Sequence, residues 1–128
     1  MHFLQEQFMI KKSTKEIPAF VAGDATLIKE ILHPKNQEVI LPYSIAHATL
    51  DPGKSSLPHI LRSSSEVYYI LSGKGKVVID GVTQAVETGD LVFIPAGARQ
   101  ELQNDSSAPI TFLCIVAPPW NKEDERVF

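Results

Sequence analysis

Several features that are common in proteins are scarce in this sequence of 128 residues. There is a single cysteine, Cys114, so no disulfide can form within the chain, and we expect a reducing compartment, the cytoplasm. No apolar run approaches the ~20 residues of a membrane helix, which predicts no membrane association. The chain has no basic block and a net charge of −3, so it is a poor candidate for binding nucleic acid.

The composition of the chain is typical of a folded domain. Hydrophobic residues make up 44% of the chain and charged residues 21%, which excludes a mainly disordered polypeptide. A chain of this length is expected to form one domain around one core.

Proline and glycine divide the chain into short segments rich in β-branched and aromatic residues. These segments predict strands at 43–50, 67–71, 76–79, 91–94 and 110–116. Residues 25–32 fit a short helix or a strand, and a strand is favoured. Asp80-Gly81 predicts a two-residue hairpin turn, and the charged residues 121–126 could form one helical turn. The turn spacing indicates an all-β sandwich or barrel, with a barrel over 25–117, an N-terminal arm over 1–24 and a C-terminal tail over 118–128.

Polar side chains interrupt three of the apolar segments. Alternation along a strand places Glu66 and Tyr68 on one face, while His59 and Gln100 lie on two other segments. If these faces point into a barrel, then His59, Glu66 and Gln100 meet at its mouth. An imidazole, a carboxylate and an amide oxygen can together hold a divalent metal ion and leave positions open for a substrate.

The spacing of these residues resembles the two sequence motifs of the cupin family. Eight positions fall in register with the motifs: Gly53, His59, Glu66, Gly73, Gly89, Pro95, Gly97 and Asn104. The resemblance implies a conserved-barrel jelly roll, which is a double-stranded β-helix of two packed antiparallel sheets. It also implies a pocket between the sheets, where typical members hold one metal ion through three histidines and one glutamate.

The sequence departs from this pattern at two of the four ligand positions. Leu61 replaces the second histidine of the first motif and cannot bind a metal, whereas Gln100 replaces the histidine of the second motif and offers a neutral, weaker donor. His47, on the preceding predicted strand, could compensate. If its face lines the pocket, then His47, His59, Glu66 and Gln100 form a site of two nitrogens and two oxygens, but the alternation does not decide which face is inside.

Three functions are compatible with these residues. The first is an enzyme that uses zinc, iron, manganese, nickel or copper to activate a small molecule, with Glu66 and Tyr68 as catalytic candidates. The resemblance allows a dioxygenase, a decarboxylase, an isomerase or a lyase. The second is a non-catalytic module for a sugar-like or apolar ligand, in which the metal site has degraded and the pocket is lined by Leu61, Tyr68, Phe93 and Leu102. A structural or partner-binding protein that uses Trp120 is a third, weaker reading.

Some residues also have a purely structural interpretation. Glu66 could form an ion pair at the rim with Arg62, Lys76 or Arg99, and Gln100 could satisfy backbone groups. Cys114 alternates with apolar residues on its strand, which favours a buried thiol over a nucleophile.

The N-terminal arm predicts a homodimer. Its apolar residues would be costly to expose to water, so we expect them to pack across a partner subunit. They are Phe3, Leu4, Phe8, Met9 and Ile10.

Overall fold

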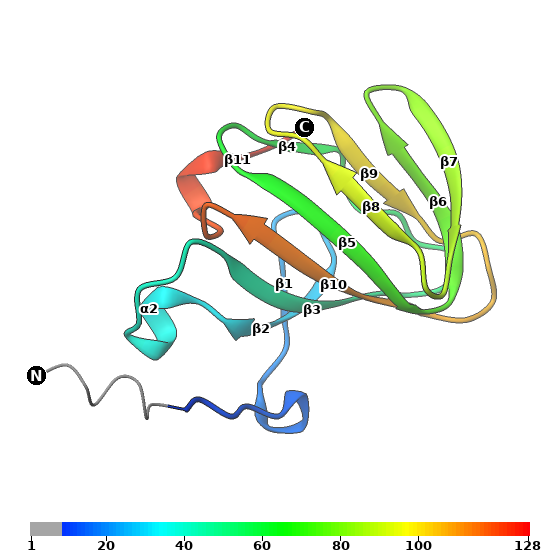
Figure 1. The fold of residues 1–128 in the computed structure, drawn as a ribbon. Coiled ribbons are helices and arrows are strands. Elements are labelled where there is room, and N and C mark those ends of the chain that lie inside the picture. The colour runs from blue at the N-terminus through cyan, green and yellow to red at the C-terminus, as the bar shows by residue number, and fades with distance from the viewer. Residues whose placement is uncertain (1–8) are drawn as a thin grey trace, which may run out of the picture.

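The computed structural model describes residues 9–128, which form a β-structure with three short helical turns (Figure 1). The strands are β1 (Phe20–Val21), β2 (Leu27–Leu32), β3 (Ser44–Leu50), β4 (His59–Leu61), β5 (Ser65–Ser72), β6 (Lys74–Ile79), β7 (Val82–Glu87), β8 (Leu91–Ile94), β9 (Gln100–Gln103), β10 (Ile110–Ala117) and β11 (Glu125–Val127). The helical turns are η1 (Thr14–Glu16), α2 (Pro34–Gln37) and η2 (Lys122–Asp124). Within residues 9–128, no helix has the length and apolar character that a membrane crossing requires.

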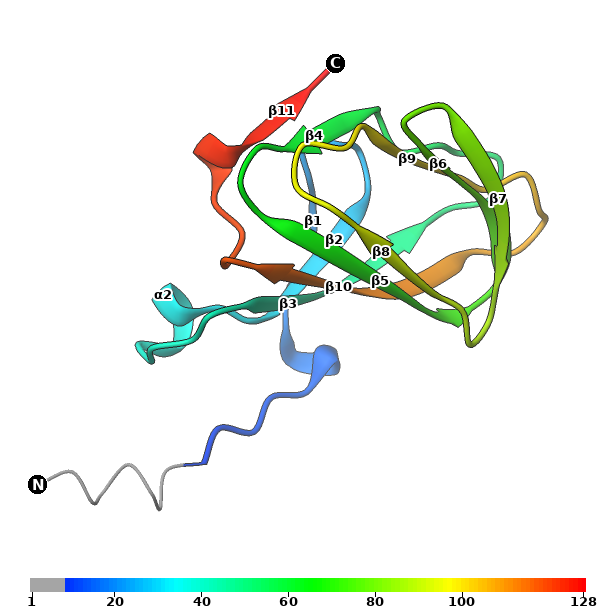
Figure 2. The ribbon, with the colours of Figure 1, turned by 45° about the horizontal axis from the view of Figure 1, so that its top comes forward.

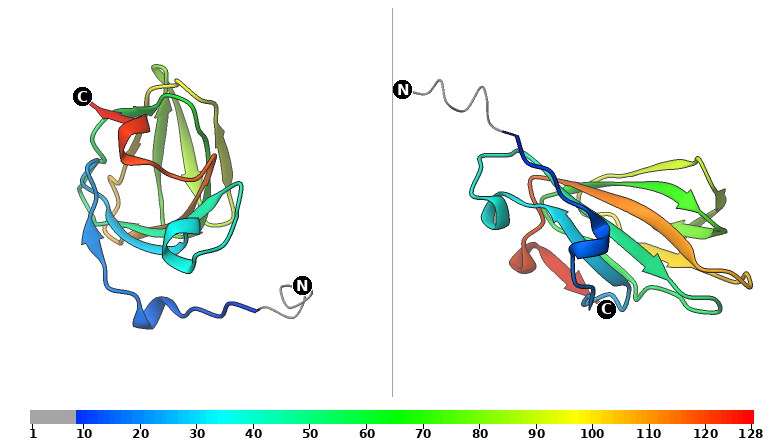
Figure 3. Two further views of the ribbon diagram at one scale, coloured as in Figure 1. Left: turned by 90° about the vertical axis from the view of Figure 1, so that its left-hand side faces the viewer. Right: turned by 90° about the horizontal axis from the view of Figure 1, so that it is seen from below.

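The strands form two antiparallel sheets that lie face to face (Figures 2 and 3). One sheet has the order β1-β2-β3-β10-β5-β8, and the other has the order β11-β4-β9-β6-β7. The connections pass repeatedly from one sheet to the other, so residues distant in sequence meet in the space between them. The predicted all-β architecture is therefore confirmed.

The predicted strands agree with the observed ones. Segments 43–50, 67–71, 76–79, 91–94 and 110–116 correspond to β3, β5, β6, β8 and β10, and the ambiguous segment 25–32 contains strand β2. The predicted hairpin joins β6 to β7. Asp80 and Gly81 both have positive φ angles, 47° and 82°, as a type I′ turn requires. The tail contains the short turn η2, as expected.

The two sheets extend beyond the predicted barrel limits of 25 and 117. β1 pairs with β2 through Phe20 and Ile28, and β11 pairs with β4 through Val127 and His59. Both ends of the described chain therefore add strands to the same end of the barrel. In the predicted N-terminal contact, Phe3, Leu4 and Phe8 lie outside the described residues, while Met9 and Ile10 are exposed.

The interior differs in character between its two ends. On β3, Ala48 and Leu50 belong to the apolar core, whereas Ser44 and Ala46 border a cavity. On β5, Ile70 is fully buried in that core, whereas Glu66 borders the same cavity. Large apolar side chains thus fill one end of the barrel, and small or polar side chains leave the other end open.

Candidate metal centre and ligand pocket

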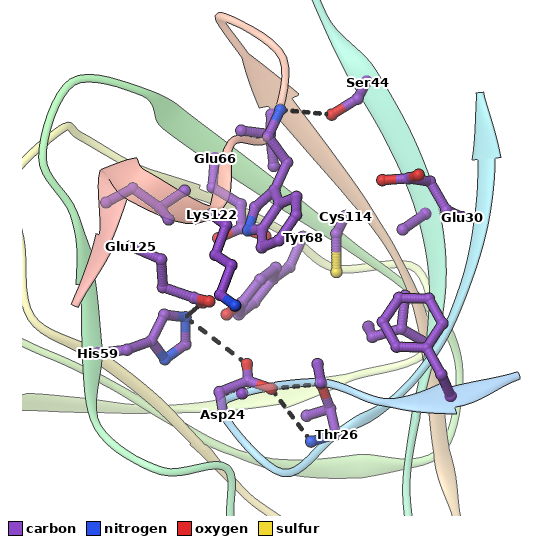
Figure 4. A pocket seen from close by; sticks show the side chains of 18 of the residues that line it. Asp24, Thr26, Glu30, Ser44, His59, Glu66, Tyr68, Cys114, Lys122 and Glu125 are labelled. Carbon is purple, nitrogen blue, oxygen red and sulfur yellow. Dashed lines mark hydrogen bonds and ion pairs between the residues drawn. The ribbon is translucent and has the colours of Figure 1, made fainter. Parts of the chain in front are cut away.

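A cavity of about 420 Å³ occupies the open end of the barrel (Figure 4). Both sheets, the loop between β1 and β2 and the C-terminal tail contribute to its wall. Apolar side chains form much of the lining, and the ionisable residues in it are Asp24, Glu30, His59, Glu66, Tyr68, Cys114, Lys122 and Glu125. A concave, largely apolar site with a few convergent polar groups is typical of small-molecule binding.

His59 is held in a fixed orientation at the start of β4. Only 2% of the residue is exposed, and its Nδ1 atom lies 2.9 Å from the carbonyl oxygen of Leu57. Because a carbonyl oxygen only accepts hydrogen bonds, Nδ1 carries the proton and donates it. The other ring nitrogen, Nε2, therefore faces the pocket, with its orientation set by a backbone carbonyl as in many metal-binding histidines.

Two carboxylates face this nitrogen. Nε2 of His59 lies 3.6 Å from Oδ2 of Asp24 and 4.0 Å from Oε2 of Glu125 (Figure 4). A ligand atom from each of these three residues lies within 4.8 Å of the other two. Asp24 is oriented by Thr26, whose backbone N–H and hydroxyl both donate to Oδ1. The N–H of Leu57 donates to the carbonyl oxygen of Asp24 at 2.7 Å. The backbone of Leu57 therefore hydrogen-bonds to both Asp24 and His59.

The donor set of this cluster fits a divalent metal ion. With the proton on Nδ1, three electron-rich atoms face one another, and only a cation or an added proton makes the arrangement favourable. Their separations exceed a normal hydrogen bond. They approach the separation of about 3.4 Å expected between two tetrahedral ligands of one zinc ion. One nitrogen and two oxygens suit zinc, iron or manganese.

The carboxyl group of Glu125 lies in a partly buried position next to both His59 and Asp24. Burial raises the pKa of Glu125, the nearby His59 lowers it, and the negative charge of Asp24 raises it again. Two half-buried carboxylates that face one histidine repel each other when all are deprotonated.

Glu66 lines the same pocket from β5, and its burial favours the protonated acid. Burial raises the pKa of Glu66 to about 8 from an ordinary 4.5, and the negative charge of Asp24 adds to the rise. Hydrogen bonding to Gln100 opposes this shift without reversing it. At neutral pH the carboxyl group therefore keeps its proton and can donate a hydrogen bond or a proton into the cavity.

Tyr68, which also lines the cavity, forms a buried pair with Gln100. The hydroxyl of Tyr68 donates to Oε1 of Gln100 at 2.5 Å, and the Tyr68 ring packs edge-on against Phe112. Burial, followed by the charge of Glu66, raises the pKa of Tyr68 well above its ordinary value. The amide oxygen of Gln100 is thus engaged by the protein, and Gln100 does not border the cavity.

The remaining predicted ligand, His47, lies on the other face of β3. Ser44 and Ala46 line the cavity, and alternation therefore directs His47 to the outside of the sheet. The structure thus brings His59 and Glu66 to one cavity, places Gln100 just behind it and leaves His47 outside.

Some expectations about neighbouring residues need correction. Leu61 and Tyr68 line the cavity as expected, but Leu102 belongs to the apolar core and Phe93 is 60% exposed on the outer face of β8. The alternative interpretation of Glu66, an ion pair at the rim, is not seen among the described residues. Among the described residues, Arg62 bonds to the Glu123 carbonyl, Lys76 pairs with Asp105 and Arg99 lies over the Phe128 ring. Cys114 is buried as predicted, although its strand face also borders the cavity.

Asp24 and Glu125 are the residues that the sequence motifs do not reveal. Asp24 precedes the predicted barrel, and Glu125 lies in a charged tail that resembles an ordinary solvated end. Only the pairing of β11 with β4 brings Glu125 to His59, and this pairing joins segments more than sixty residues apart in the chain. No local pattern encodes such a contact.

Two facing antiparallel sheets with a ligand-sized cavity between them define a jelly-roll barrel, and a histidine with two carboxylates lines the cavity. The cupin domain family matches residues 46–116, which contain both predicted motifs. The chain belongs to the cupin family.

Comparisons with individual proteins agree with this assignment. The uncharacterized protein MJ1618 of Methanocaldococcus jannaschii is 31% identical over 119 residues, which are 93% of this chain and 94% of that protein. A predicted oxalate decarboxylase of Thermotoga maritima superposes with a TM-score of 0.76 at 21% identity, covering 85% of this chain and 99% of the other. A variant of Streptomyces Pac13 with uridine superposes with a TM-score of 0.74 at 18% identity, covering 94% and 92%. At these identities the two solved structures show a shared fold.

Proposed function

We propose that this cupin binds one divalent transition metal ion through His59, Asp24 and Glu125, and a small molecule in the adjoining cavity. The observation that carries this proposal is the convergence of one oriented imidazole nitrogen and two carboxylates within 4.8 Å at the cavity mouth. A bound ion there would supply a Lewis acid for an oxygen atom of the substrate. Zinc, iron and manganese suit these ligands best.

We further propose that Glu66 is the acid of this site. Its proton is retained at neutral pH, and its side chain faces the same cavity as the metal cluster. A buried acid with a shifted pKa beside a ligand pocket is typical of a catalytic group. Tyr68 would act through Gln100, which hydrogen-bonds to both Tyr68 and Glu66. This arrangement favours proton transfer on a small substrate.

Metal titration tests the ligand set. Untagged protein stripped with a chelator should take up one equivalent of zinc or manganese, measured by calorimetry and elemental analysis. His59→Ala should abolish this uptake. Asp24→Asn and Glu125→Gln should each weaken it at least about tenfold, because each keeps the side-chain size but removes a charged ligand.

His47→Ala is the matched control for this experiment. It removes an imidazole from the outer face of β3 and should leave metal affinity unchanged. Equal losses in His47→Ala and His59→Ala, or no uptake by the unchanged protein, would contradict the proposed site.

A second function is a binding module without turnover. The replacement of two family ligand positions by Leu61 and Gln100 favours it. The Glu66→Gln variant separates the two functions once a ligand is known. Loss of turnover with ligand affinity retained supports the enzyme, whereas a ligand that is bound and never converted supports the module.

A further inference from the structure

Lys122, an exposed residue outside the cupin motifs, contributes a positive charge to the lining of the pocket. It belongs to η2, in the C-terminal tail, and it lines the cavity that contains His59 and Glu125. Its side chain points into the cavity in Figure 4. The ion pairs among residues 9–128 involve His59 with its two carboxylates and Lys76 with Asp105, so the ammonium group of Lys122 is not committed to a partner there.

The charge balance of the pocket depends on the metal ion. Without the metal ion, the acidic residues Asp24, Glu30 and Glu125 outnumber Lys122 in the lining, and their negative charges would repel an anionic ligand. A divalent ion held by Asp24 and Glu125 cancels two of these charges. Lys122 and the open metal positions then become the groups that attract an anion.

Trp120, two residues before Lys122, adds apolar surface to the cavity. Trp120 lines the cavity and is 36% exposed. The backbone N–H of Trp120 donates to Oγ of Ser44 at 2.9 Å, and its backbone carbonyl oxygen accepts a hydrogen bond from Nε2 of His33 at 2.8 Å. Nδ1 of His33 accepts from the N–H of Lys35, so the proton of this ring is on Nε2. The backbone of Trp120 is thus anchored to β3 and to the start of α2, and the residue contributes apolar lining to the cavity beside Lys122.

Building on the proposed metal site, we propose that the pocket recognises an anion with a flat apolar body. Its carboxylate is held between the metal ion and the ammonium group of Lys122, and its body lies against Trp120 and Phe112. Lys122 is the residue that selects a charged head group over a neutral one. A cavity of about 420 Å³ accommodates a molecule of one or two rings.

Benzoate and benzamide test this proposal, because they share a shape and differ in charge. Zinc-loaded full-length protein should bind benzoate roughly tenfold more tightly than benzamide, since ionic hydrogen bonds are about twice as strong as neutral ones. Acetate, which lacks the ring, should bind more weakly than benzoate. Binding is measured by calorimetry and by the fluorescence of Trp120, the single tryptophan in the chain.

Variants of Lys122 test whether its ammonium group causes the preference for benzoate over benzamide. Lys122→Met should weaken benzoate binding roughly tenfold and leave benzamide unchanged, while Lys122→Arg should largely restore benzoate binding. Lys76→Met, at a lysine that pairs with Asp105 outside the pocket, should change neither. Zinc affinity should be retained in Lys122→Met, which shows that the metal site is intact.

The outcomes separate this inference from the proposed function. Zinc uptake with equal affinity for benzoate and benzamide, or with benzoate binding unaffected by Lys122→Met, would overturn the inference and leave the metal site standing. Absence of zinc uptake would overturn the metal site. In that case, benzoate binding to the metal-free protein that is lost in Lys122→Met would still support Lys122 as the anion site, and absence of binding would overturn both.

Discussion

Glu66 is the residue whose chemistry is most altered by its surroundings. Its side chain lines the same cavity as His59, Asp24 and Glu125, and burial raises its pKa to about 8. The unfolded chain releases the same proton near the ordinary value of 4.5. The folded state therefore binds one more proton than the unfolded state between these two values, and folding is linked to pH through this residue.

The sign of this linkage gives a stability prediction. The stabilising contribution is complete below about pH 4.5 and is lost as the pH rises through about 8, so the free energy of unfolding should fall across this range. Glu66→Gln removes the ionisable group and should flatten the dependence by an amount on the order of a few kcal/mol. Urea unfolding of chelator-treated protein at about pH 5, 7 and 9 measures the effect.

Glu87→Gln provides the control, since Glu87 is exposed on β7. It should leave the slope with pH as in the unchanged protein. A Glu66→Gln variant with the same slope as the unchanged protein would show that Glu66 is ionised in the folded state.

Strand β5 illustrates how one element serves both the core and the site. Its inward residues Glu66, Tyr68 and Ile70 are buried, while Tyr69 and Leu71 on the other face are exposed. The same two-residue period thus directs an acid to the pocket and an aliphatic side chain to the core. Neighbours in sequence should consequently differ strongly in their contribution to stability.

Alanine substitutions at adjacent positions of β5 measure this difference. Ile70→Ala should lower the free energy of unfolding by about 2–5 kcal/mol, because Ile70 is fully buried and the loss leaves a cavity. Leu71→Ala should cost roughly 1 kcal/mol or less, because its side chain is 38% exposed. Chemical denaturation checks both, and similar costs at the two positions would contradict the observed orientation of the strand.

At the scale of the whole molecule, both ends of the described chain close the same cavity. Asp24 follows β1 near the start, and Glu125 begins β11 near the end. β11 is joined to the barrel by only three paired positions on β4. A metal ion bound to His59, Asp24 and Glu125 would connect these two segments to the barrel.

Metal binding should therefore stabilise the whole fold. A ligand that binds only the folded state adds about 2.7 kcal/mol when its free concentration is about one hundred times its dissociation constant. We expect a gain of this size for zinc-saturated protein and none for His59→Ala, measured by urea unfolding with and without zinc. Equal gains in both proteins would indicate binding elsewhere.

The cytoplasmic location and the homodimer expected from the sequence remain predictions. The homodimer can be tested by sedimentation of the full chain at several concentrations. A monomer at all of them would remove the proposed role of the N-terminal apolar residues.

The sequence by itself determined the fold and half of the site. Apolar alternation and turn residues specify the strands locally, and the register of Gly53, His59, Glu66 and Asn104 is typical of the cupin motifs. His59 and Glu66 could be predicted because each lies inside such a motif. Local patterns suffice here because strand direction and turn geometry depend on residues that are close in the chain.

The tertiary structure decided the rest of the site. The outward position of His47 depends on which face of β3 packs inside, and alternation alone allows either face. The arrival of Asp24, Lys122 and Glu125 at the cavity depends on the pairing of β1 with β2 and of β11 with β4. These contacts join segments distant in sequence, so they arise only from the packing of the complete molecule.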